Sequence, residues 1–138
     1  MSTPDQNKAR LAEAYAAWDR SKGDDTDAWM ALVDEDVCFS SLSGGRPGIA
    51  FAHECRGREE MIGFFRGLTE TLAMDRFDVT EFVAEGDRVV AIGTCSWTAR
   101  ATGRSFTTPY ALVASFRDGL IVEAREFYDT AMVAGAVG

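Results

Sequence analysis

Residues 116–131 read FRDGLIVEAREFYDTA and contain the turn and the strand on which the interpretation of the chain depends. An Asp-Gly pair between apolar residues is a strong signal for a β-hairpin turn. The run after the pair predicts a strand, in which side chains alternate between two faces. Glu126 therefore shares a face with Val122 and Tyr128. Because that face is the more apolar one, the carboxylate on it marks a candidate site.

Several segments before this turn also show a hydrophobic period of two. Short turns join the four segments from residue 77 onward, so these strands must pair antiparallel, since parallel pairing needs a long crossover. The predicted strands are residues 37–42, 77–84, 88–99, 105–116 and 120–127.

The N-terminal part of the chain has a helical period instead. Thr3, Pro4 and Gln6 form a capping-box signature at the start of a first helix, which Gly23 ends. Further helices are predicted at about 26–33, from 58 to about 73, and at 130–137. Helices followed by a strand meander predict an α+β fold in which the helices cover one face of a bent antiparallel sheet. The whole chain, 1–138, is long enough to form a single domain.

The loop of the last hairpin decides which residue lies opposite Glu126. A two-residue Asp118-Gly119 loop would place it opposite Ala111, and a three-residue loop from Arg117 would place it opposite Tyr110. We favour the three-residue loop, because it gathers the apolar residues of both strands on one face. With Thr102-Gly103 as the preceding turn, Trp97 is expected opposite Thr108 and Cys95 opposite Tyr110. Glu126 is then the only charged residue on the face that carries these side chains.

Composition excludes several classes of function. The chain has a net charge of −8 and scattered Lys and Arg residues, so it lacks the basic stripe that nucleic acid requires. No apolar run reaches membrane-spanning length, and the first ten residues lack a signal-peptide core. The three cysteines, Cys38, Cys55 and Cys95, show no metal-type spacing, and an odd number argues against a disulfide framework. We therefore expect a cytoplasmic protein with reduced thiols.

The order of these elements resembles that of the nuclear transport factor 2-like superfamily, and within it the SnoaL-like proteins. The similarity covers nearly the whole chain, from the first helix through GREEMIGFF (57–65) to FRDGLIVEAREFYDTA. It implies a cone-like barrel: a strongly bent antiparallel sheet with three N-terminal helices packed on its concave face, open to a small apolar ligand. Members include polyketide cyclases, steroid isomerases, epoxide hydrolases, dehydratases and non-catalytic binders.

Two enzyme groups within that superfamily give local matches. Residues 102–129 are similar to limonene-epoxide hydrolases without a gap, and Glu126 takes the place of their catalytic aspartate. Gly93 and Cys95 stand where those enzymes have an arginine and an aspartate, so the water-activating network is incomplete. Tyr15 matches the helix-1 tyrosine of ketosteroid isomerases. Their base aspartate falls near Ser41, so that catalytic set is incomplete too.

Glu126, His53 and Tyr15 are the candidate catalytic residues. Burial in an apolar cup raises the pKa of a carboxyl, which suits a general acid or base near neutral pH. His53, the only histidine, has a near-neutral pKa by nature and lies in the apolar stretch 49–55, which we expect to line the mouth of the cone. The alternative for Glu126 is a structural carboxylate bonded to tyrosines or to an arginine.

An aromatic wall with a few polar groups is expected around these residues. The predicted ligand-binding residues are Trp18, Trp29, Phe39, Ser41, Cys95, Trp97, Thr108, Tyr110 and Tyr128. Plain core packing is the alternative for the aromatic residues. Nothing cationic lies beside Cys95 in the sequence, so an inert buried thiol is favoured over a nucleophile. The acidic clusters at 24–27 and 34–36 fit helix ends and turns, so no metal and no cofactor are predicted.

These features predict a cofactor-independent enzyme that transfers protons on a small hydrophobic metabolite, by isomerisation, cyclisation, or addition or removal of water. The alternative is a non-catalytic ligand-binding or dimerisation module of the same fold. The outer face of the sheet suggests a homodimer, because it is expected to carry the apolar residues Ile92, Ala111, Val113, Ile121 and Phe127.

Overall fold

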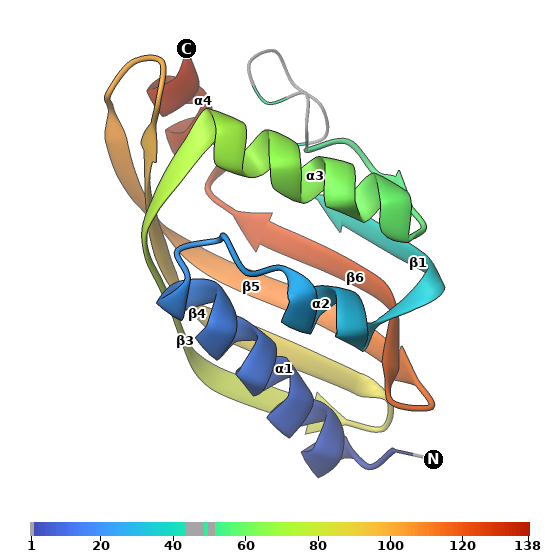
Figure 1. Cartoon of the computed structure of the whole chain (residues 1–138). Helices are drawn as coiled ribbons and strands as arrows, with labels where there is room; N and C mark the ends of the chain where they lie inside the picture. Colours follow the sequence, from blue (N-terminus) through green and yellow to red (C-terminus); the bar gives the residue numbers. More distant parts are fainter. Residues whose placement is uncertain (1, 44–48, 50–51) are drawn as a thin grey trace.

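The structure is a computed structural model, and it describes residues 2–43, 49 and 52–138. The described residues form an α+β fold (Figure 1). The helices are α1 (Pro4–Arg20), α2 (Asp27–Leu32), α3 (Arg58–Thr71) and α4 (Thr130–Val137). The strands are β1 (Val33–Ser41), β2 (Cys55–Arg56), β3 (Leu72–Glu85), β4 (Arg88–Ala99), β5 (Ser105–Arg117) and β6 (Leu120–Tyr128).

The strands form a curled six-stranded sheet in the order β2-β1-β6-β5-β4-β3. The meander from β3 to β6 is antiparallel, as predicted. The prediction of a wholly antiparallel sheet was wrong at one place, because β1 pairs with β6 in parallel. No short turn joins these two strands, since α3 and the meander lie between them in the chain, so their direction was not constrained by a hairpin.

Helices α1, α2 and α3 lie over one face of this sheet (Figure 1). Helix α1 begins with the predicted capping box, in which the Thr3 hydroxyl accepts from the Gln6 backbone N–H and the Gln6 side chain accepts from the Thr3 N–H. Its apolar stripe, including Leu11, Tyr15 and Trp18, is buried against the sheet. The end of α1 is fixed to β3, because Asp19 Oδ1 accepts a 2.9 Å hydrogen bond from the Phe77 N–H.

The hairpin between β5 and β6 differs from the predicted one. Its loop has two residues, Asp118 and Gly119, and both have positive φ angles (52° and 82°), as a type I′ turn requires. A bulge then leaves Val122 without a cross-strand partner, so Ile121 faces inward near the turn and Glu126 faces inward beyond the bulge. Glu126 therefore lies opposite Leu112, and the predicted pairing with Tyr110 was wrong.

The β4–β5 hairpin keeps the predicted inward face in a different register. Its loop is longer than the Thr102-Gly103 turn, and the Ala99 N–H donates to the Arg104 carbonyl at 2.8 Å. Cys95 lies opposite Thr108, and Trp97 opposite Phe106. Because the shift is two residues, every side chain stays on the face that the sequence predicted.

Gly93 allows the sharp bend between β3 and β4. A Cβ atom on Gly93 would lie 1.9 Å from the Asp78 carbonyl oxygen and 2.7 Å from the Val79 Cα. Strand β3 has a bulge directly after this point, between Val79 and Glu81. The bulge and the close approach of the two backbones bend the sheet.

The outer face of the sheet carries part of the apolar set that was expected there. Ile92 is 37% exposed, and Ala111, Val113 and Phe127 are partly buried. Ile121 was wrongly placed in that set, because the bulge turns it inward, where it is 1% exposed. Among the described residues, no helix has the length and apolar content to cross a membrane.

Candidate functional site

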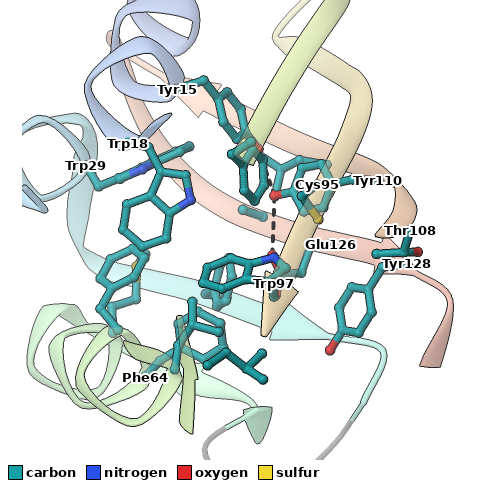
Figure 2. A pocket seen from close by; sticks show the side chains of 18 of the residues that line it. Tyr15, Trp18, Trp29, Phe64, Cys95, Trp97, Thr108, Tyr110, Glu126 and Tyr128 are labelled. Carbon is teal, nitrogen blue, oxygen red and sulfur yellow. Dashed lines mark hydrogen bonds between the residues drawn. The ribbon is translucent and has the colours of Figure 1, made fainter. Parts of the chain in front are cut away.

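A hollow lies between the helices and the concave face of the sheet (Figure 2). Its empty volume is about 820 Å³, including the solvent at its mouth. About half of the residues that line it are aromatic, and they come from both the helices and the sheet. All three tryptophans and all three tyrosines of the chain line it: Trp18, Trp29, Trp97, Tyr15, Tyr110 and Tyr128.

Glu126 is the only Asp, Glu, Lys, Arg or His among the described residues that line this hollow. Strand β6 holds it between Ser41 of β1 and Leu112 of β5. The bulge after the type I′ turn brings its side chain to the concave face. Figure 2 shows Glu126 across the hollow from Trp18 and Trp29.

Two hydroxyl groups hold the carboxyl group of Glu126. Tyr110 donates to its Oε2 at 3.3 Å, and Ser41 also hydrogen-bonds to the side chain. Burial raises the pKa of Glu126 from 4.5 to about 7, and the hydrogen bonds from Ser41 and Tyr110 oppose this rise. The carboxyl therefore exchanges its proton near neutral pH, which is the range in which a general acid or base works best.

A second tyrosine extends this network toward α1. The hydroxyl groups of Tyr15 and Tyr110 lie 2.8 Å apart and are hydrogen-bonded. Since Tyr110 uses its proton for Glu126, Tyr15 donates to Tyr110. Burial raises the pKa values of both phenols well above 10, so both stay neutral at physiological pH.

A further chain of hydroxyl groups runs from Ser41 to the start of the 43–55 segment. The Ser41 hydroxyl is 2.5 Å from that of Tyr128, which also hydrogen-bonds to Ser43. Ser43 is 1% exposed. The Ser41 side chain does not line the hollow, so its contribution there is the hydrogen bond that it makes to Glu126.

Cys95 and Thr108 line the hollow as polar groups with little reactivity. Burial raises the pKa of the Cys95 thiol to about 12, so it stays protonated. The Thr108 hydroxyl is 1% exposed, accepts from the Asp129 N–H at 2.8 Å and donates to the Pro109 carbonyl. Thr108 therefore joins β5 to the end of β6.

The structure brings together most of the residues that the sequence nominated. Glu126, Tyr15, Trp18, Trp29, Phe39, Cys95, Trp97, Thr108, Tyr110 and Tyr128 all line the hollow. His53 does not line it, and its side chain is exposed. Ile49 and Ala52 of the same stretch are buried, whereas Ala50, Phe51 and residues 44–48 lie outside the described residues.

Phe77 was not nominated, although it lies at the centre of the aromatic cluster. Its ring centroid is 4.7 Å from that of Tyr110, 5.6 Å from that of Tyr15 and 6.2 Å from that of Trp97. A predicted pairing of β3 with β4 would have identified Phe77 as a lining residue, because Phe77 lies opposite Cys95. In the described part of the chain, no cluster of His, Cys, Asp or Glu is arranged to hold a metal ion.

Comparisons with known proteins agree with this architecture. The SnoaL-like domain family matches residues 11–124. An NTF2-like protein from Burkholderia thailandensis E264 is 31% identical, with a TM-score of 0.82, over 100% of this chain and 99% of that chain. An NTF2-like protein of unknown function from Burkholderia pseudomallei K96243 is 29% identical, with a TM-score of 0.85, over 99% and 98% of the two chains.

The fold also occurs in more distant proteins. TerC, co-crystallised with polyporic acid, has a TM-score of 0.80 at 19% identity, over 96% of this chain and 98% of that chain. A search of curated proteins gives no match. The family match and the 31% identity over the full length show that the chain belongs to the SnoaL-like family of NTF2-like proteins.

Proposed function

We propose that this protein is a cofactor-independent enzyme that moves protons on a small hydrophobic molecule, with Glu126 as the acid or base. One observation carries the proposal: a single carboxyl group, held by Tyr110 and Ser41, lies in a hollow whose other described lining residues are uncharged and mostly aromatic or aliphatic. Such a setting suits a group that must take and return a proton near neutral pH. The SnoaL-like fold also serves polyketide cyclases and isomerases, which supports this class of reaction.

In this proposal the ionised carboxyl of Glu126 removes a proton from the bound molecule and its protonated form returns one. Tyr110, backed by Tyr15, would hold the carboxyl in position beside the substrate, because the pair forms a connected hydrogen-bond chain that ends at Glu126. Isomerisation, cyclisation, and addition or removal of water all fit this scheme. His53 has no part in it, since its exposed side chain does not line the hollow.

The test uses neutral probes whose chemical change reports proton transfer. The probes are 2-tetralone in D₂O, in which removal of an α-proton gives deuterium incorporation, and cyclohexene oxide, in which water addition gives a diol. Binding is measured by calorimetry, and products are measured by mass spectrometry. We expect Glu126→Gln to keep the affinity for the probes and to lose the chemical change.

Glu123→Gln is the matched control, because Glu123 is an exposed residue on the same strand and the substitution removes the same charge. It should behave as the wild type. Deuterium exchange at the wild-type rate in Glu126→Gln would contradict the role of Glu126. Binding without any chemical change in the wild type would favour the alternative, a non-catalytic binding module. Homodimer formation through the outer sheet face is a further proposal, which light scattering at micromolar concentration tests.

A further inference from the structure

The polar groups of the hollow are unbalanced in charge. Among the described residues, Glu126 lines the hollow, and no Lys, Arg or His does. Two arginines on the helices that cover the hollow are engaged elsewhere: Arg10 of α1 donates to the Gly119 carbonyl at 2.7 Å and Arg58 of α3 donates to the Val33 carbonyl at 2.7 Å. An acidic ligand would therefore meet a carboxyl group and no compensating cation.

We propose that the hollow selects hydrophobic cations: its ligand carries a protonated amine or a quaternary ammonium group that lies against the aromatic rings beside Glu126. This inference rests on the proposed function only in that the hollow is taken as the ligand site. It adds the charge class of the ligand, which the proposed function leaves open.

The aromatic lining supports a cation at this position. Tyr110 lies next to Glu126 through a hydrogen bond, and the rings of Phe77 and Tyr15 lie within 6.0 Å of that of Tyr110, centroid to centroid. The faces of aromatic rings carry negative electrostatic potential and attract cations, most strongly where water is excluded. Trp97 adds another large ring at the same side, 6.2 Å from Phe77.

The hydrogen bonds around Glu126 also favour a cationic ligand. Tyr15 donates to Tyr110, and Tyr110 donates to Glu126, so both phenol protons are used within the protein. What this hydrogen-bond chain leaves for a ligand is a set of acceptors, the lone pairs of Glu126 and Tyr15, and a protonated amine offers only donors to them. The one described lining atom that is a fully buried donor without a protein partner is Trp29 Nε1, and a neutral indole N–H does not compensate an anion beside a carboxylate.

A positive ligand charge also suits the ionised form of Glu126. Burial raises the pKa of Glu126 to about 7, because the ionised form loses hydration. A cation beside the carboxylate restores the lost stabilisation, whereas an anion increases the cost of ionisation. The other titratable groups around the carboxyl are Tyr15, Tyr110, Tyr128, Cys95 and Cys55, and burial raises the pKa of each, so they stay neutral and do not offset a ligand charge.

The test compares four probes of similar size and different charge. They are 2-phenylethylamine, 2-phenylethanol, phenylacetate and benzyltrimethylammonium, whose charge is permanent. Affinities are measured by isothermal titration calorimetry at neutral pH and constant ionic strength. We expect both cations to bind about tenfold or more tightly than the alcohol, which is the size of effect that one desolvated cation–aromatic contact supplies. Phenylacetate should bind most weakly.

Two variants assign the effect to the site. Glu126→Gln should lose most of the preference for the cations while keeping the affinity for the alcohol, and Glu123→Gln should keep the preference. Equal affinities for the alcohol and the cations, or tightest binding of phenylacetate, would overturn this inference and leave the proposed function standing. Failure of all four probes to bind would overturn both, because the hollow would then not be a ligand site.

Discussion

Replacing Glu126 with glutamine should remove a specific pH dependence from the stability of the protein. The unfolded chain titrates this carboxyl near its usual pKa of 4.5, whereas burial raises the pKa to about 7 in the folded protein. Between these values the folded protein keeps a proton that the unfolded chain has released. The free energy of unfolding therefore falls as the pH rises through this window.

The size of the effect follows from the difference between the two pKa values. Each pKa unit corresponds to about 1.4 kcal/mol, so ionising Glu126 in place costs the folded state about 3 kcal/mol once the pH exceeds 7. Glutamine has the same shape, keeps an oxygen for the Tyr110 hydroxyl and does not ionise. We expect Glu126→Gln to gain about 3 kcal/mol over the wild type between acidic and mildly alkaline pH.

Urea denaturation at a series of pH values from about 4 to 8, at constant ionic strength, measures this difference. Glu123→Gln is again the control, because Glu123 is exposed and its removal should leave the slope of the wild type unchanged. Parallel pH profiles of the wild type and Glu126→Gln would refute the reasoning, since they would show that Glu126 titrates alike in the folded and unfolded states.

Two further substitutions test the parts that hold this carboxyl and the sheet in place. Tyr110→Phe removes the donor 3.3 Å from Glu126 Oε2, so the pKa of Glu126 should rise above its wild-type value. A ¹³C NMR titration of labelled glutamate measures this pKa, and an unchanged or lowered value would contradict the hydrogen bond. Gly93→Ala places a Cβ against the Asp78 carbonyl and should lower the free energy of unfolding by about 3 kcal/mol or more. The control is Gly63→Ala on α3, where a Cβ has open space and should raise the free energy of unfolding by about 0.5–1 kcal/mol. Equal effects of the two substitutions in thermal unfolding would contradict the close approach of β3 and β4.

Local signals in the sequence were sufficient for the helices and the strand meander. The capping box at Thr3 and the stripe through Tyr15 and Trp18 located α1, because they depend only on near neighbours in the chain. The inward orientation of Glu126 was also predicted, although through the wrong loop. The Asp-Gly turn takes its preferred two-residue form, and the bulge at Val122 restores the apolar face. Such a bulge leaves no signal of its own in the sequence.

The features that the sequence did not predict depend on contacts between residues far apart in the chain and on the path of a loop. The parallel contact between β1 and β6 brings Ser41 next to Glu126, and no turn or period in the chain indicates it. Phe77 was missed for a related reason, since its place opposite Cys95 depends on a bulge earlier in β3. His53 was nominated for its chemistry, but the path of a loop decides where a side chain points, and here the side chain is exposed.

The parallel junction of β1 and β6 also determines when the pocket can form. Ser41 and Tyr128, which are hydrogen-bonded across this junction, are separated by 87 positions in the chain. During synthesis the first strand must wait for the last one to leave the ribosome before it has a neighbour on that side. Contacts of such long range are made late and slowly in folding. The carboxyl and its supporting hydroxyl groups therefore come together only when nearly the whole polypeptide has been made.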